Sequence, residues 1–530
     1  MGNLIARYWP QFVVLAVAVV LWAPRLTGPI DLRWDGGVYY VLGTSLATGQ
    51  GYRILSEPGS PEMLRYPPLL PAIVAACQRA LGSTDPAVVG PWLRILYAVL
   101  FLAYALAVLV LAKRYLRPVF AVIAVAFSLV QPTTIWVSDL LYTEIPFALI
   151  SVLFVLVAVD GPFLSRPWPR ETASFILATA GFLLRTAGIA LLAAWVLEAI
   201  VHRRWRLLLV RGLLATLPII AWETYVVRVT HSYEYSHPAY AYQRAPSHPY
   251  NGSYAESVGL IDPSHPGWRH RLSDLTSQLR ANTRPLIESF GEALSTTRRV
   301  PTLLLSALAI VGLAMLVRRR AWMLLLIVLV SVVIIWPMPW PNQFYRYLVP
   351  LTPFLVIGVI MVLDELCAAL SALPVRPIIA TSGRITLAML VVLAFMLQIS
   401  SALKLFYDRA HGASYVKGYG ASGQRFFHYS DLSRGWDLAI AWIQSHSDPN
   451  AIVLTHAPQL CYLRTGRRAV LPPVERNQER VRELLDSIPV SYVILDPIDS
   501  MPAIEKDRQR WRSVESVSRV RLYERISAPE

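Results

Sequence analysis

Charged residues and cysteines are both scarce in this chain of 530 residues. Only 16% of the residues are Asp, Glu, Lys or Arg, whereas soluble globular domains carry about 25%. Because 55% of the residues are hydrophobic, this balance argues against a soluble domain and predicts a polytopic α-helical membrane protein. The cysteines are Cys77, Cys367 and Cys461, and they show no CxxC spacing, so neither a disulfide framework nor a cysteine metal site is expected.

The sequence also lacks the motifs of two well-known chemistries. It holds no Walker loop and no HExxH motif, which removes the main support for nucleotide-driven transport and for zinc-protease chemistry. The histidines between residues 231 and 270 are not closely paired as metal ligands usually are. No metal site is therefore expected from the residues alone.

Negative charge is the minority, with 34 acidic residues against 49 Lys and Arg, a net charge of +15. In a soluble protein this excess would suggest a nucleic-acid partner. Here most of the excess is arginine in short segments between apolar stretches, which is typical of cytoplasmic loops in membrane proteins. We therefore expect membrane lipids around the chain and no nucleic acid.

Apolar stretches of the length that crosses a bilayer, about 20 residues, recur along the chain. One further stretch, 172–201, is longer and is interrupted at Arg185. It is predicted to cross twice as two short helices, because a single span would put a basic cluster on the wrong side. The total is then about eleven spans with a cytoplasmic N-terminus. The other predicted spans are 9–26, 89–112, 118–137, 143–159, 207–228, 301–317, 321–336, 347–366 and 385–402.

The first stretch also resembles a cleaved signal peptide, since it has an arginine, an apolar core and Ala23. Signal peptides usually have shorter apolar regions, and removal would leave the charge pattern unanchored. The chain is thus divided into a transmembrane domain, 1–402, and an extracytoplasmic domain, 403–530. Alternating short β-rich and helical segments predict an α/β fold for the second. Within the first, 27–88 is expected to be an outer loop with surface helices and 229–300 a large outer loop.

The segment DLRWDGGVYYVLGTSLATGQGY, residues 31–52, places two aspartates just beyond the first span. Asp35 opens a predicted surface helix, where a carboxylate at the mouth of a cavity is suited to act as a general base. The alternative is that Asp35 only caps this helix, because Asp is a favoured N-cap residue. Asp31, nearer the membrane, is expected to be solvated.

Two further acids, Asp139 and Glu144, bracket the top of a later span. Acidic groups at membrane depth are costly and are functional candidates by default, so both are candidate cavity acids. A solvated loop would also explain Asp139, whereas Glu144 lies within the apolar stretch and is better placed to face a cavity.

Two arginines, Arg185 and Arg346, are predicted near the same outer face. Arg185 lies in apolar surroundings and needs a counter-charge or an anionic ligand. Arg346 stands beside aromatic residues, where arginine is often only an interfacial anchor. Together the two could clamp a lipid-linked phosphate.

Several of these segments resemble membrane glycosyltransferases of the GT-C fold. The resemblance is to the bacterial relatives of protein O-mannosyltransferases and of the lipid A aminoarabinose transferase. It is carried by WDGGVYYVLGTSLATGQGY, RYPPLLP, TEIPF, LLRTAG and RYLVPLTPF in the first 402 residues, and by AWIQSHSDPNAIVLTH and YLRTGRRAVLPP in the tail. It spans most of the chain, although each motif alone is loose.

The resemblance implies transfer of a sugar from a polyprenyl-phosphate donor to an acceptor hydroxyl at the outer face of the cytoplasmic membrane. It implies Asp35 as catalytic base and Arg185 and Arg346 as phosphate ligands. The substrate-lining residues would be Tyr39, Tyr40, Tyr66 and Tyr347. Some relatives use a divalent metal and others need none, so no cofactor is assigned.

The acceptor is left open as a glycan, a lipid or a protein. Gly36 follows Asp35 where the mannosyltransferases have an Asp-Glu pair, which weighs against a protein acceptor. The alternative function is a multi-pass transporter or flippase, but only one broken hairpin is found, with no matching second half. A non-catalytic scaffold would leave the outer acids and arginines unexplained. The sugar and the carrier length are not predicted.

Overall fold

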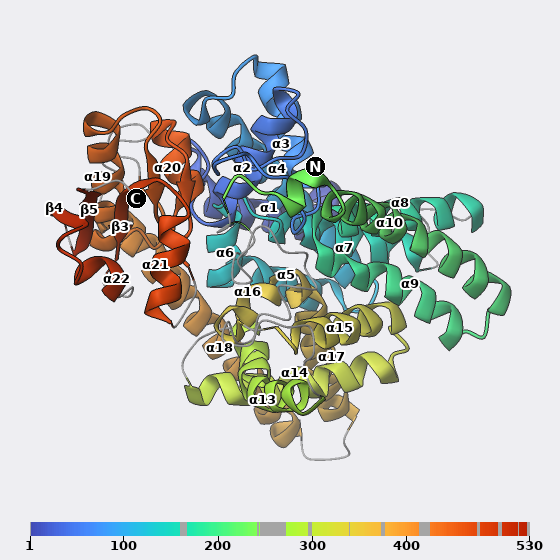
Figure 1. The fold of residues 1–530 in the computed structure, drawn as a ribbon. Coiled ribbons are helices and arrows are strands. Elements are labelled where there is room, and N and C mark those ends of the chain that lie inside the picture. The colour runs from blue at the N-terminus through green and yellow to red at the C-terminus, as the bar shows by residue number, and fades with distance from the viewer. Residues whose placement is uncertain are drawn as a thin grey trace.

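The computed structural model describes residues 2–159, 167–240, 243, 272–294, 299–338, 340–372, 377–412, 425–473, 477–496, 501–517 and 519–526. Helices make up most of this structure, and a small sheet forms near the C-terminus (Figure 1).

Every apolar stretch predicted to span the membrane forms a helix or a pair of helices. Among the residues that the structure describes, five helices are long and apolar enough to cross a membrane, and a bent pair is a sixth candidate. The protein is thus a multi-pass membrane protein, whereas the total of eleven spans stays a prediction. The helices are α1 (Gly2–Trp22), α4 (Pro86–Ala112), α5 (Pro118–Val130), α6 (Pro132–Ser138), α7 (Glu144–Ala158), α8 (Pro167–Leu184), α9 (Ile189–Val201), α10 (Trp205–Thr230), α14 (Arg299–Arg318), α15 (Trp322–Ile335), α17 (Thr352–Ala372) and α18 (Pro377–His411).

The bend between α5 and α6 follows from Pro132, which has no backbone N–H to continue the helix. Gln131 caps the new helix with its side-chain oxygen, 2.5 Å from the backbone nitrogen of Thr134, and the two axes differ by 59°. This bend turns the chain toward the α6–α7 junction, which carries Asp139 and Glu144.

The predicted break at Arg185 is confirmed. Arg185 is extended, with φ of −157°, and a 3-10 turn, η2 (Thr186–Gly188), leads into α9. A Cβ atom at Gly188 would collide with the backbone carbonyl of Gly181 in α8, so only glycine permits this close approach. The break leaves the Arg185 side chain at the junction of two helices and not within a continuous one.

The first loop contains η1 (Ala23–Arg25), α2 (Asp35–Ala47) and α3 (Leu69–Leu81). The prediction that α2 lies on the surface is wrong, because most of its residues are buried on all sides. Its small residues allow close packing: a Cβ at Gly43 would overlap Val74 of α3. On another side α2 packs against α20 (Pro458–Thr465). The loop is therefore a packed layer between the helical bundle and the C-terminal region.

Besides α14 and α15, the structure describes five further elements between α10 and α17. They are α11 (Tyr233–Ser236), α13 (Leu272–Leu294), η4 (Pro341–Gln343), α16 (Phe344–Tyr347) and η5 (Val349–Leu351). The centre of the predicted outer loop 229–300 lies outside the described residues. Helix α13 packs against α14 and α16. It therefore stands beside the short helix that carries Arg346.

The C-terminal region builds a five-stranded sheet of order β2-β1-β3-β5-β4, in which β1 pairs in parallel with β2 and β3 and the other pairs are antiparallel. The strands β1, β3 and β5 and the helices α19 and α21 fall on segments predicted from the sequence, whereas β2, β4, α20 and α22 were not predicted. Helix α18 continues to His411, past the boundary predicted at 402, and the limits of a separate domain stay a prediction. The other elements are α19 (Asp431–His446), β1 (Ile452–Leu454), β2 (Ala469–Val470), α21 (Gln478–Asp486), β3 (Val490–Leu495), α22 (Pro502–Glu505), β4 (Trp511–Val517) and β5 (Val520–Arg525).

This region, orange to red in Figure 1, packs onto the first loop in blue. The backbone nitrogen of Ala469 donates to the carbonyl of Ser56, and Arg33 donates to the carbonyl of Phe427. Residues more than 350 positions apart are thereby brought to one face of the bundle, beside the start of α2.

Candidate active site

A cavity of about 520 Å³ lies where the first loop, the α8–α9 break and α16 meet. It is lined by most of the residues that the sequence singled out, namely Asp35, Tyr39, Tyr66, Arg185, Arg346 and Tyr347. The C-terminal region contributes His456 to the same wall. Segments far apart in the sequence thus converge on one polar cavity.

Asp35 occupies the first turn of α2, but it is not the N-cap, which is Trp34. Its carboxylate accepts instead from Arg346 Nη2 at 2.6 Å and from the Tyr66 hydroxyl at 3.0 Å. A side chain that only capped the helix would bond the backbone nitrogens of its own first turn. The capping alternative is therefore wrong, and Asp35 is directed into the cavity.

The charge state of Asp35 is set by two opposing effects. Burial acts to raise the pKa of Asp35, but the charge of Arg346 and the hydrogen bonds from Arg346 and Tyr66 outweigh it. The pKa of Asp35 is therefore held below its ordinary value. Asp35 is ionised at neutral pH and forms an ion pair across the cavity.

Arg346 joins two carboxylates. Its Nη2 contacts Asp35, and its Nε lies 2.6 Å from Oε1 of Glu144. Arg185 approaches the same Glu144 oxygen at 3.4 Å. Glu144 is fully buried behind the two arginines and does not line the cavity, so it acts as their counter-charge.

Both guanidinium groups also lie over aromatic rings. Arg346 stands 4.2 Å from the centroid of Tyr142, and Arg185 stands 5.3 Å from that of Tyr347. These contacts hold the planar groups in place. Arg185 Nη1 has no hydrogen-bond partner among the described residues. The same Nη1 lies 3.4 Å from Glu144, so the two arginines share Glu144 as a counter-charge and are candidates to bind an anion.

Tyr39 and Tyr40 were both predicted to line the substrate site. Of the two, only Tyr39 lines the cavity. Tyr39 packs edge-on against Tyr66, with ring centroids 5.2 Å apart. Tyr40 is fully buried on another side of α2 and donates its hydroxyl to the carbonyl of Thr84.

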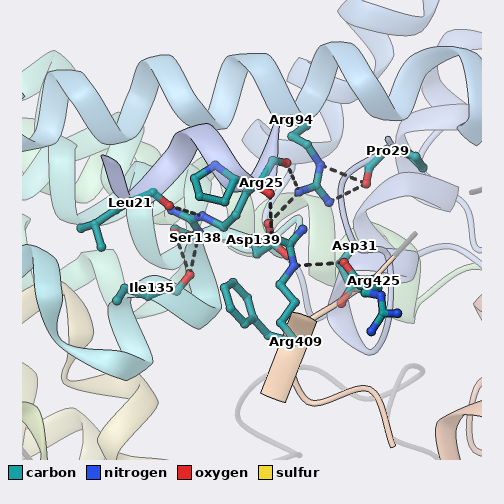
Figure 2. Close-up of polar contacts among 12 residues, drawn as sticks. Leu21, Arg25, Pro29, Asp31, Arg94, Ile135, Ser138, Asp139, Arg409 and Arg425 are labelled. Atoms are coloured by element: carbon teal, nitrogen blue, oxygen red, sulfur yellow. Dashed lines mark hydrogen bonds and ion pairs between the residues drawn. The ribbon is translucent and has the colours of Figure 1, made fainter. Parts of the chain in front are cut away.

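Asp139 does not line the cavity either. It is 1% exposed and pairs with Nη1 of Arg94 at 2.8 Å (Figure 2). Arg94 also donates to the carbonyls of Pro29 and Arg25, which ties α4 to the first loop. The predictions of a cavity acid and of a solvated loop residue are both wrong for Asp139, because an arginine within an apolar helix draws this carboxylate inward.

Asp31 was expected to be solvated and is 2% exposed. It accepts from the guanidinium of Arg33 at 2.6 Å. Its backbone carbonyl accepts from Leu141, and its backbone nitrogen donates to Asp139. Asp31 therefore anchors the loop to the α6–α7 junction, four residues before the residue that faces the cavity.

Several cavity residues were missed by the sequence reasoning. Arg65 precedes Tyr66 in the RYPP segment, and Trp340 belongs to the PMPWPN segment, so both had a local signal. Arg65 lies 5.1 Å from the centroid of Trp340. His456 had no local signal, because only the folding of the tail onto the first loop brings it there. Among the residues described in the structure, no group of three or more His, Cys, Asp or Glu side chains could hold a metal ion.

The helical bundle, the packed first loop and the C-terminal sheet together have the GT-C fold, as two solved structures show. ArnT from Cupriavidus metallidurans has a similar structure in the apo state, with a TM-score of 0.53 and 12% identity over 98% of each chain. The oligosaccharyltransferase AglB from Archaeoglobus fulgidus, in complex with an inhibitory peptide and a dolichol-phosphate, superposes with a TM-score of 0.54 and 13% identity. That match covers 93% of this chain and 70% of AglB.

At this identity the likeness shows the fold alone. No family model and no curated protein matches the sequence.

Proposed function

We propose that the protein is a glycosyltransferase that moves a sugar from a polyprenyl-phosphate donor to an acceptor hydroxyl at the outer face of the membrane. The observation that carries this proposal is the Asp35–Arg346–Glu144 arrangement at the cavity, with Arg185 beside it. A carboxylate suited to take a proton and two arginines suited to hold a phosphate face one space. The solved ArnT structure bound to undecaprenyl phosphate supports a donor of this class.

In the proposed reaction, the acceptor oxygen attacks the anomeric carbon of the donor sugar. The bond between that carbon and the phosphate oxygen breaks, and polyprenyl phosphate leaves. The acceptor proton passes to Asp35, which acts as the general base. Because Arg185 and Arg346 stabilise the negative charge on the leaving phosphate, no acid is needed to protonate it. A single displacement of this kind inverts the configuration at the anomeric carbon.

The ion pair between Asp35 and Arg346 implies that the donor binds before Asp35 acts as a base. While Arg346 bonds Asp35, the carboxylate is a weak base, as its lowered pKa indicates. A donor phosphate that binds Arg346 competes with Asp35 for the same N–H groups. Donor binding would thereby raise the basicity of Asp35 when it is needed. Tyr39, Tyr66 and Tyr347, which line the cavity, would contact the sugar or the phosphate.

We also infer that the cavity faces the outer side and that the N-terminus is cytoplasmic, with about eleven spans. The charge distribution supports this orientation. Arg117, from the α4–α5 connection, pairs with Asp364 of α17. Arg318, the last residue of α14, and Arg319 pair with Glu365. The basic residues between α4 and α5 and those at the end of α14 therefore lie beside the C-terminal half of α17, on the side expected to be cytoplasmic. Arg346 lies just before the start of α17, on the opposite side. Over 21 residues α17 spans about 31 Å, the thickness of a bilayer core.

The test begins with mass spectrometry of carrier lipids and envelope glycans from cells with and without the protein, which identifies the donor sugar. The purified protein is then given that polyprenyl-phosphate sugar, and release of polyprenyl phosphate is measured. We expect Asp35→Asn to lower turnover by at least about 100-fold, the lower end of the contribution of a general base. Asp364→Asn, at the far end of α17, is the matched control and should keep the wild-type rate.

If Asp35→Asn transfers sugar at the wild-type rate, the proposed mechanism fails. If the wild-type protein moves a labelled polyprenyl-phosphate lipid between leaflets without releasing its sugar, the transporter alternative is correct.

A further inference from the structure

A second cavity, of about 700 Å³, lies beside the first. Trp34, Trp136, Asn342 and Tyr345 line both cavities, so these residues form a shared wall. On its other sides the second cavity is bounded by α13, by the last turns of α18 and by the start of α6. The proposed reaction uses the first cavity for the donor and leaves the second unassigned.

The two cavities differ in charge. The first is lined by Arg65, Arg185 and Arg346. Among the described residues, the charged side chains that line the second are Glu288, Glu292, Lys404 and Asp408, with His428 beside them and no arginine. An anion such as a lipid phosphate is therefore stabilised in the first cavity and repelled in the second. The second favours a neutral or cationic occupant.

The charged side chains that line the second cavity differ in whether they form ion pairs. Lys404 contacts Asp408 at 2.5 Å, and Glu288 is paired with Arg284 at 2.9 Å. Glu292 makes no ion pair with another described residue, and burial together with the neighbouring Glu288 raises its pKa above the ordinary value. A carboxyl group of this kind bonds hydroxyl groups as acceptor or, once protonated, as donor.

The aromatic part of the shared wall is held under backbone strain. Trp34 has φ of 55°, and His428 has φ of 50°, conformations that non-glycine residues rarely adopt. Both rings make edge-on contacts with Trp136, at centroid distances of 5.9 and 5.2 Å. Trp34 is nevertheless 52% exposed. The fold thus holds a large aromatic face open to both cavities at a conformational cost, which is typical of functional positions.

An exposed indole beside carboxylate and amide groups suits one class of ligand in particular. The apolar C–H face of a sugar ring packs on the indole, while its hydroxyl groups bond side chains such as Glu292 and Asn342. Trp34 also directly precedes Asp35, the proposed base. A sugar stacked on Trp34 would therefore hold a hydroxyl group close to the carboxylate that accepts its proton.

We propose that the second cavity binds the acceptor as a carbohydrate, neutral or amino-substituted, with Trp34 as the surface on which its ring stacks. This inference rests on the proposed glycosyl transfer, because the acceptor is defined by that reaction. It narrows the acceptor from a glycan, a lipid or a protein to a glycan or the sugar portion of a glycolipid.

The test is saturation-transfer difference NMR on the full-length protein in detergent micelles. The probes are methyl glycosides of mannose, galactose, glucosamine and arabinofuranose, methyl glucuronide as an anionic sugar, and a serine-containing hexapeptide. Signals are expected on the ring protons of at least one neutral or amino sugar, and not with the glucuronide or the peptide. Trp34→Gly should weaken these signals at least fivefold, and Glu292→Gln should weaken them as well.

Trp34→Gly is chosen because glycine adopts φ of 55° without strain, so the variant should fold. The control is Trp92→Ala, at a tryptophan that is 56% exposed and lines neither cavity, and it should keep the full signals. Absence of signals with all the saccharides, equal signals in Trp34→Gly, or signals with the peptide alone would overturn the inference.

Binding of undecaprenyl phosphate is measured on the same samples. It should be retained in Trp34→Gly, because Arg185 and Arg346 remain, even though Trp34 also lines the first cavity. If Trp34→Gly loses saccharide binding but still binds the donor lipid, the defect lies in the second cavity. A wild-type protein that binds no polyprenyl phosphate refutes the proposed function instead, so the two failures are distinguishable.

Discussion

Two clusters of acids and arginines link the first loop to the α6–α7 junction, and they differ in what satisfies their charges. The inner cluster consists of Arg25, Asp31, Arg94 and Asp139 (Figure 2). The cavity cluster consists of Asp35, Glu144, Arg185 and Arg346. Their acids alternate along the sequence, Asp31 with Asp35 and Asp139 with Glu144, so sequence position alone does not separate them.

In the inner cluster the arginines donate most of their hydrogen bonds to backbone carbonyls. Arg25 donates to Leu21 and Ile135, and Arg94 donates to Pro29 and Arg25. All four of its side chains are buried. Such charges hold chain segments together and have little capacity left for a ligand.

In the cavity cluster the arginines contact carboxylates and aromatic rings instead of the backbone, and Asp35 is 25% exposed. A ligand phosphate can replace a carboxylate at a guanidinium, whereas it cannot replace a backbone carbonyl without unfolding the loop. We therefore expect the inner cluster to contribute to stability and, under the proposed function, the cavity cluster to bind the ligand.

The largest expected effect on stability is that of Arg94→Met. This change leaves Asp139 as a buried charge without its main partner, which costs about 3–5 kcal/mol. Thermal unfolding in detergent should show a large fall in melting temperature. Arg117→Met, which removes a surface pair, should change stability by less than about 1 kcal/mol. An Arg94→Met protein as stable as the Arg117→Met protein would contradict a structural role for the inner cluster.

The next effect concerns ligand binding by the cavity cluster. Arg346→Lys keeps the charge but loses the planar group that reaches Asp35 and Glu144 together. Affinity for undecaprenyl phosphate should fall about 10- to 100-fold, the equivalent of one hydrogen bond between charged groups. Calorimetric titration measures it. Arg117→Lys serves as control, and equal affinities of the two variants would refute the phosphate site.

Two tyrosines, one bonded to Asp35 and one on another side of α2, allow the same comparison at a smaller scale. Tyr66→Phe removes the hydroxyl that donates to Asp35, which should lower turnover about 3- to 10-fold at unchanged stability. Tyr40→Phe removes the hydroxyl bonded to Thr84, which should lower stability by about 1 kcal/mol at unchanged turnover. The reverse pattern would mean that the two sides of α2 have been assigned wrongly.

The smallest effect is a pH dependence. The folded pKa of Asp35 is lowered, so its ion pair stabilises the protein above the unfolded pKa of about 3.9 and is lost as pH falls through the folded value. The difference in melting temperature between wild type and Asp35→Asn should therefore stay constant from about pH 5 to 8 and shrink only below about pH 4. A change of this difference between pH 5 and 8 would show that Arg346 does not hold Asp35 ionised.

Much of the cavity could be predicted from the sequence because its residues lie next to strong membrane signals. Asp35 follows the first apolar stretch, Arg185 interrupts another and Arg346 begins a third, so the charge pattern placed all three at one face. The structure brings them into one cavity. The segments carrying these residues also have the helix order expected from the apolar stretches.

The division into two clusters could not be predicted from the same signals. Whether Asp139 or Glu144 faces the cavity depends on which arginine lies opposite after folding, and Arg94, the partner of Asp139, is 45 residues away along the chain. Arg94 did leave one signal, an arginine inside an apolar stretch that requires a buried acidic partner. The group of rings around Trp136 had no such signal, because His428 reaches Trp136 only when the tail packs beside the first loop.

The most direct test of the central claim measures melting temperature and turnover per folded molecule for Asp31→Asn and Asp35→Asn. Asp31→Asn leaves Arg33 buried beside a neutral partner, so we expect a large loss of stability and normal turnover in the folded fraction. Asp35→Asn should keep its melting temperature near neutral pH within a few degrees, since Arg346 retains Glu144, and should lose at least about 100-fold in turnover. Equal turnover for wild type and Asp35→Asn, or a turnover loss in Asp31→Asn as large as in Asp35→Asn, would contradict the account.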